Sequence, residues 1–246
     1  MPWPKCAPSV ARMNSPAVLR LGAGAAIAGA AAQLIATVLE PDWAGDAGEA
    51  VRVVSGSGIW VADRVLDLIG VFLTIAALTI AGRMLAGGGR EWVLIGSPFL
   101  ILMGALGGSA ILTGALMKDM AQQWERADDV AQQSYLAAFE AMRLTTGGLF
   151  FGAFLSLGIY LAALAPAILQ GETFPHWLGW ACAASASLVL GGNLLSIVSE
   201  PAFFAVLAGL ALFLVVVAAL GVAMWRRASS YGVAAARNPL SAAEQS

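Results

Sequence analysis

The stretch that decides the fold is IWVADRVLDLIGVFLTIAALTIAGRML, residues 59 to 85. It is long enough to cross a bilayer as a helix, because about 20 apolar residues span a hydrocarbon core of roughly 30 Å. Its first third nevertheless carries Asp63, Arg64 and Asp67. Charged side chains at membrane depth usually face a protein interior or a water-filled cavity rather than lipid. Asp63 and Asp67 are four residues apart and share one helix face, so the stretch predicts a transmembrane helix whose polar face is turned toward its neighbours.

The composition of the whole chain agrees with this prediction. Of its 246 residues, 59% are hydrophobic and only 11% are charged, whereas a soluble domain has about a quarter charged residues. Further apolar segments of about 20 residues or more accompany the first. We therefore predict an all-α, polytopic bundle of six transmembrane helices, a domain of residues 18–225. The six spans are expected near residues 18–39, 59–84, 92–117, 136–169, 177–199 and 202–225.

The segments between and around the spans are polar. Residues 1–17 precede an apolar run too long for a signal peptide, so we expect a cytoplasmic segment and a retained first span, with Met1 or Met13 as the start. Residues 40–58 are expected to form an acidic loop. Residues 118–133, KDMAQQWERADDVAQQ, predict a surface helix outside the bilayer, and residues 226–246 predict a disordered tail.

The distribution of lysine and arginine predicts the orientation. With both termini in the cytoplasm, eight of the 13 basic residues lie on the cytoplasmic side, as the positive-inside rule requires. The eight are Lys5, Arg12, Arg20, Arg83, Arg90, Arg226, Arg227 and Arg237. We therefore expect a protein of the plasma (cytoplasmic) membrane with both termini inside.

In this orientation, nearly every polar side chain at membrane depth lies in the outer third of the bilayer. The candidate site residues are Gln33, Asp63, Arg64, Asp67, Glu140, Arg143, Asn193 and Glu200. Two interpretations stay open. The arginines and carboxylates form a structural ion-pair network, or they line an outward-facing site that binds a cation, a proton or a substrate group.

Several site types are excluded by the residue inventory. A single histidine, His176, and two cysteines, Cys6 and Cys182, provide neither a bis-histidine haem nor a metal site with cysteine spacing. Phosphate-binding, nucleophile-elbow and zinc-protease motifs are missing from the sequence. We therefore expect no cofactor, no metal and no nucleic-acid partner.

One segment, GGLFFGAFLSLGIYLAALAPAILQGETFPHWLGW (residues 147–180), carries a resemblance to a known family. A long apolar helix runs into a short connector, followed by Pro175 and the Trp177-Leu178-Gly179 start of the fifth span. The layout from Arg20 to Arg227 resembles a family of small six-span bacterial membrane proteins of unknown function. This resemblance implies six helices and no particular activity.

Three functions are compatible with the pattern. The leading hypothesis is a membrane protein that binds or moves a small molecule or ion at the outer polar residues. The second is a subunit or assembly partner of a membrane complex, docking through the apolar sixth span and residues 118–133. The third is an enzyme that uses a buried carboxylic acid on a lipid-soluble substrate, with Asp67, Glu140 or Glu200 as the acid. Membrane lipids are expected partners in all three cases.

Overall fold

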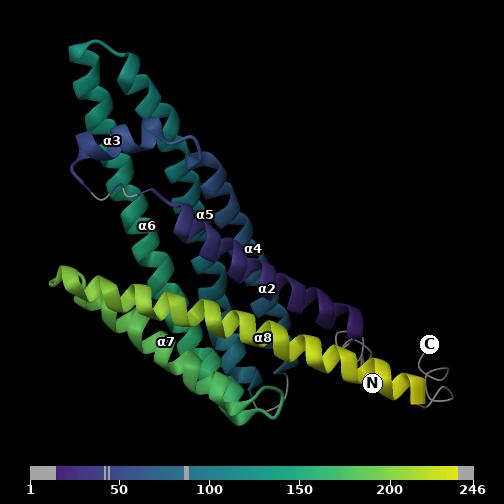
Figure 1. Cartoon of the computed structure of the whole chain (residues 1–246). Helices are drawn as coiled ribbons and strands as arrows, with labels where there is room; N and C mark the ends of the chain where they lie inside the picture. Colours follow the sequence, from purple (N-terminus) through teal and green to yellow (C-terminus); the bar gives the residue numbers. More distant parts are fainter. Residues whose placement is uncertain (1–14, 42, 44, 86–88, 238–246) are drawn as a thin grey trace, which may run out of the picture.

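The computed structural model describes residues 15–41, 43, 45–85 and 89–237, and in these residues it contains helices and no strand (Figure 1). The predicted all-α fold is confirmed. The elements are α2 (Pro16–Leu39), α3 (Ala47–Gly56), α4 (Trp60–Met84), α5 (Arg90–Arg126), α6 (Asp129–Gln170), α7 (His176–Leu195), the 3-10 turn η1 (Glu200–Ala202) and α8 (Phe203–Arg237).

Six of these helices, all except α3, are long and apolar enough to cross a membrane, which confirms the six predicted spans. Two of them are much longer than a bilayer requires. With 37 residues in α5 and 42 in α6, their lengths are about 55 Å and 63 Å against a hydrocarbon core of roughly 30 Å. The two helices therefore extend as a hairpin well beyond the ends of α2 and α4 (Figure 1).

This hairpin corrects the prediction of a separate surface helix over residues 118–133. The first part of that segment continues α5 as far as Arg126, and the rest begins α6 at Asp129. No glycine or proline interrupts residues 115–126, so the backbone hydrogen bonding of α5 continues. The turn comes at Asp128, whose carboxylate accepts a hydrogen bond from the Ala131 amide at 2.9 Å and caps α6.

The predicted acidic loop of residues 40–58 contains the short helix α3, which lies across the hairpin (Figure 1). Asp46 caps its start by accepting a hydrogen bond from the Glu49 amide at 2.8 Å. One face of α3 packs on the hairpin and forms a second hydrophobic core, separate from that of the bundle. This core comprises Ala50, Val51, Val54, Trp60, Met117, Ala121 and Phe139.

The end of the chain also differs from the prediction. Residues 226–237, expected to belong to a disordered tail, continue α8 as far as Arg237. Four alanines in this segment favour the helix. Residues 1–14 and 238–246 lie outside the described residues. Met1 and Met13, the two candidate start residues, both fall in the first of these ranges.

Glycines set the closest approach between α2 and α4. A β-carbon added at Gly29 would lie 2.8 Å from Thr74 Oγ1 and 2.9 Å from the Thr74 amide nitrogen, and one at Gly70 would lie 2.7 Å from Gln33 Cγ. The backbones of the two helices are therefore in contact, the kind of packing that small residues allow within a membrane.

The two ends of the bundle differ in charge. Because neighbouring spans alternate in direction, the starts of α2, α5 and α7 lie at the same end as the finishes of α4, α6 and α8. We call this the basic end; its charged residues with described side chains are Arg20, Arg83, Arg90, Arg226 and Arg227 with Glu91 and Glu172. The opposite end carries α3 and the hairpin, and we call it the α3 end.

Candidate functional site

The candidate site is built around Arg64, one turn into α4, which is only 4% exposed. Its guanidinium lies over the Trp60 ring, with Cζ 4.4 Å from the ring centre. On its other side is Gly114 of α5, where an added β-carbon would lie 3.6 Å from Arg64 Nε. The Trp60 indole nitrogen also donates to the Gly114 carbonyl at 2.7 Å, so the two residues hold α4 and α5 together.

The partner of Arg64 is Glu40, the residue that follows α2, and the two side chains form an ion pair. The same carboxylate oxygen, Glu40 Oε1, accepts a hydrogen bond from Trp43 Nε1 at 2.9 Å. The Trp43 and Trp60 rings meet edge to face, with their centres 5.5 Å apart. Sequence reasoning missed Glu40 because it lies just beyond the first span; the signal was its place as the first charged residue after that span.

Two further carboxylates lie on the same face of α4. Asp63 is 2% exposed, and its Oδ2 lies 3.8 Å from Arg64 Nε. Within the described residues, Asp63 Oδ1 and Arg64 Nε have no hydrogen-bond partner. Asp67, one turn deeper in the span, is half-buried and makes no hydrogen bond or ion pair with the described part of the chain. One guanidinium therefore pairs with Glu40 and lies beside Asp63, while a third carboxylate, Asp67, follows one turn further along α4.

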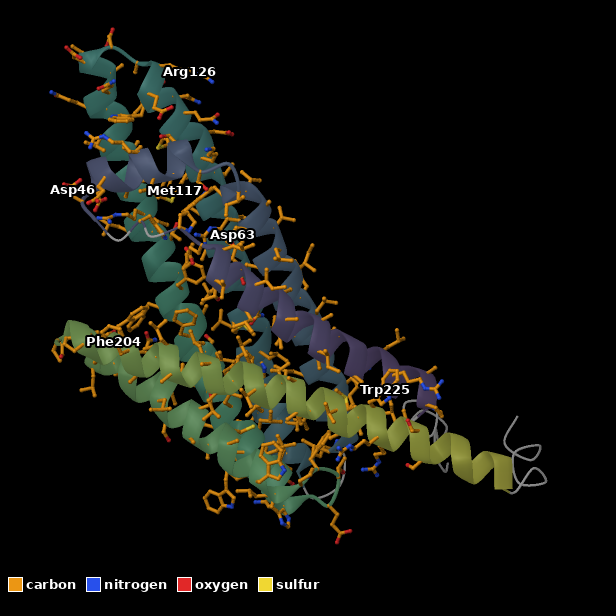
Figure 2. All side chains as sticks on the ribbon, viewed as in Figure 1. Asp46, Asp63, Met117, Arg126, Phe204 and Trp225 are labelled. Atoms are coloured by element: carbon orange, nitrogen blue, oxygen red, sulfur yellow. The ribbon has the colours of Figure 1, made fainter. Side chains whose placement is uncertain are left out.

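Polar contact between α2 and α4 continues toward the middle of the bundle. Gln33 Nε2 donates to Thr74 Oγ1 over 3.3 Å, one turn beyond the close approach at Gly70. We call this line of side chains between the two helices the polar seam. It consists of Glu40, Asp63, Arg64, Asp67, Gln33 and Thr74. Figure 2 shows Asp63 where the helices converge beneath α3.

The other predicted site residues lie outside the polar seam. Glu140 and Arg143 of α6 form a bidentate ion pair, in which the guanidinium donates two hydrogen bonds to the carboxylate at 2.7 and 3.0 Å. Arg143 Nη1 also donates to the Gly45 carbonyl at 2.8 Å, which ties the α2–α3 connector to α6. Asn193 Nδ2 donates to the Phe151 carbonyl at 2.9 Å and joins α7 to α6. Glu200 begins η1, and its side chain is outside the described part of the structure.

Sequence reasoning also missed Lys118, which holds the end of α3 on the hairpin. Its ammonium group donates to three carbonyls at the end of α3, those of Val54, Ser55 and Ser57, at 2.9, 2.6 and 2.8 Å. These carbonyls lack partners within the helix, so a cation is well placed to satisfy them. The Ser55 hydroxyl adds a 2.6 Å hydrogen bond to Glu125 of α5.

We expect Lys118→Met to release α3 without unfolding the bundle. The substitution removes charge-assisted hydrogen bonds, each worth about 1.5–3 kcal/mol, from a helix too short to be stable alone. Hydrogen–deuterium exchange should accelerate in residues 47–56 and stay unchanged in α7. Arg126→Met, which removes an exposed charge at the tip of the hairpin (Figure 2), is the matched control. Equal exchange in the two variants would contradict the role of Lys118.

Comparison of the chain with protein-family models, with curated protein sequences and with solved structures gave no match. Within the described residues, no group of three or more histidine, cysteine, aspartate or glutamate side chains is arranged to hold a metal ion.

Proposed function

We propose that this multi-pass membrane protein binds a cation at the polar seam, and that the cation is a proton. The observation that carries the proposal is the excess of carboxylates: the polar seam has three, Glu40, Asp63 and Asp67, and one guanidinium, and within the described residues Asp63 Oδ1 is buried without a partner. Burying a charge is costly unless it is paired and hydrogen-bonded. A carboxylate without a cation partner at membrane depth is best neutralised by taking up a positive charge.

The surplus charge falls on Asp67. Glu40 is paired with Arg64, and Asp63 lies in the first turn of α4, where the positive end of the helix dipole offsets a negative charge. That effect falls off beyond the first turn, so Asp67 lacks it. Asp67 is thus the side chain of the polar seam with the least compensation for its charge.

A proton suits this arrangement better than a metal ion. Calcium and magnesium need six or more oxygen ligands in total, whereas the carboxylates of the polar seam are not grouped as metal ligands. A proton needs one carboxylate oxygen and no further coordination. The proposal therefore concerns acid–base chemistry at one or two side chains.

The packing supports binding rather than a continuous path across the membrane. Beyond Thr74, the face of α4 that is turned inward continues with Ala77, Leu78 and Ala81, all buried. These side chains cannot carry a proton. Passage to the basic end would require α2 and α4 to separate.

Fewer observations support the enzyme hypothesis than support proton binding. Of its candidate acids, Asp67 lies on the polar seam, whereas Glu140 is already paired with Arg143 on α6. For the subunit hypothesis, the exposed apolar side chains of α8 suit lipid as well as a partner helix, so they do not favour an assembly role.

Labelling with a hydrophobic carbodiimide, which reacts with protonated carboxyl groups, tests the proposal. We expect the purified protein to be modified at Asp67, located by peptide mass spectrometry, and Asp67→Asn to abolish that modification. Glu140→Gln should leave it intact, because Glu140 is engaged by Arg143. If no carboxyl group of the polar seam reacts at any pH at which the protein stays folded, the proposal is wrong.

We also propose that the basic end faces the cytoplasm, which places both termini inside and opens the polar seam toward the outside. Single cysteines introduced into a background without Cys6 and Cys182 test this orientation. A membrane-impermeant maleimide added to intact cells should label Val130→Cys, in the hairpin, and leave Trp177→Cys unlabelled until the cells are opened. Both positions are exposed, at 80% and 54%. The reverse labelling pattern would place the termini outside.

A further inference from the structure

A second feature between α2 and α4 lies toward the basic end, away from the charges of the polar seam. It is an apolar groove of about 440 Å³ on the outer surface of the bundle. Its walls include Gly24 and Ala28 of α2 and Leu73, Ala76 and Ile80 of α4. Small side chains create the space, since a β-carbon added at Gly24 would meet no heavy atom within 4 Å.

One charged residue, Arg20, lines this otherwise apolar groove. It lies near the start of α2, at the basic end, and its side chain is exposed. Within the described residues it forms no ion pair or hydrogen bond through its guanidinium. A guanidinium binds phosphate oxygens through two parallel hydrogen bonds, so it is suited to a phosphate group at the membrane surface.

The charges around the groove favour an anionic ligand. Among the residues whose side chains are described, the basic end carries five arginines against two glutamates, and α8, which brings Arg226 and Arg227 to that end, packs beside α2. Basic side chains at the edge of a membrane attract anionic lipids. A zwitterionic lipid would bring its own ammonium group next to these arginines, which reduces the attraction.

From these observations we infer that the groove binds one anionic phospholipid. One acyl chain lies along Gly24, Ala28 and Ala76, and the phosphate group is held by Arg20. Any apolar groove that faces the membrane accepts an acyl chain, so Arg20 provides the selectivity for an anionic headgroup. The shape of the groove retains the lipid. This site is independent of the proton proposed at Asp67, because neither Arg20 nor the groove belongs to the polar seam.

Native mass spectrometry of the purified full-length protein, with added phosphatidylglycerol or phosphatidylethanolamine, tests the inference. Wild-type protein should retain one phosphatidylglycerol in preference to phosphatidylethanolamine. Arg20→Gln should remove that preference. Gly24→Leu, which places a side chain in the open groove, should reduce retention of both lipids while circular dichroism shows an unchanged helix content.

Two control variants decide whether the site is specific. Arg226→Gln removes one positive charge from the same end but not from the groove, and Gly148→Leu adds the same side chain at an open position on α6. Both should bind lipid as the wild type does. Equal loss in Arg20→Gln and Arg226→Gln would mean diffuse attraction and overturn the inference, as would retention of phosphatidylglycerol by Gly24→Leu. Wild-type protein with no preference between the lipids would overturn it as well.

Discussion

Replacing Arg64 by methionine should lower the free energy of unfolding by about 3–5 kcal/mol, the range found when one partner of a buried ion pair is removed. The substitution leaves Glu40 and Asp63 without their cation at the α3 end of the polar seam. It also removes the guanidinium from the Trp60 ring, which helps to hold α4 against α5. Methionine fills a similar volume, so the lost charge rather than a cavity should dominate.

Equilibrium unfolding in detergent micelles measures this effect, and a second arginine provides the control. Arg143→Met breaks a partly exposed pair with Glu140, for which we expect a loss of about 1 kcal/mol or less. The triple variant Arg64→Met, Glu40→Gln, Asp63→Asn should recover most of the lost stability, because neither position 40 nor position 63 then carries a charge that has lost its cation. A single Arg64→Met variant as stable as the wild type would show that the ion pair does not stabilise the fold.

Replacing Gly29 by valine should also destabilise the bundle strongly, by about 3 kcal/mol, the upper part of the range typical of an overpacked core. The new β-carbon would lie 2.8 Å from Thr74 Oγ1 and 2.9 Å from the Thr74 amide nitrogen. The amide belongs to the backbone of α4 and cannot rotate away, so the two helices have to separate. Separation would also break the Gln33–Thr74 hydrogen bond.

Gly24→Val is the matched control for this prediction, because it makes the same substitution on the same helix. Its β-carbon meets no heavy atom within 4 Å, so the two variants share the intrinsic helix propensity of valine and differ in the clash. The melting temperature of each purified variant in detergent measures the difference. If the two variants have the same melting temperature, α2 and α4 are not in backbone contact at Gly29.

The architecture was predictable because each transmembrane span can be recognised from its own length and amino-acid composition. The apolar stretch of residues 59–85 needs only its own length and composition to become α4, and the same holds for the five other spans. The face of α4 that turns inward was predictable for the same reason. Asp63 is buried and Asp67 is half-buried, as the spacing of the two residues on one helix face required.

The partners of the candidate site residues were less predictable. Glu40 and Trp43 follow the first span and come to Arg64 and Trp60 only because α2 and α4 pack side by side. Lys118 was predicted to lie on a surface helix, and its three carbonyl partners lie at the end of α3, in a segment predicted to be a loop. Such contacts join residues 17 to 64 positions apart, and no local pattern encodes them.

The amino-acid sequence by itself determined that this chain forms six apolar helices and that charged residues gather toward one end of them, because both properties depend on the composition and spacing of neighbouring residues. Only the tertiary structure decided how those charges are shared. It engaged Arg143 with Glu140 and the Gly45 carbonyl and Asn193 with α6, and it gave Arg64 to Glu40 and Asp63, which leaves Asp67 as the surplus carboxylate. The physical reason is that pairing depends on which helices touch, and glycines such as Gly29 and Gly70 bring α2 against α4.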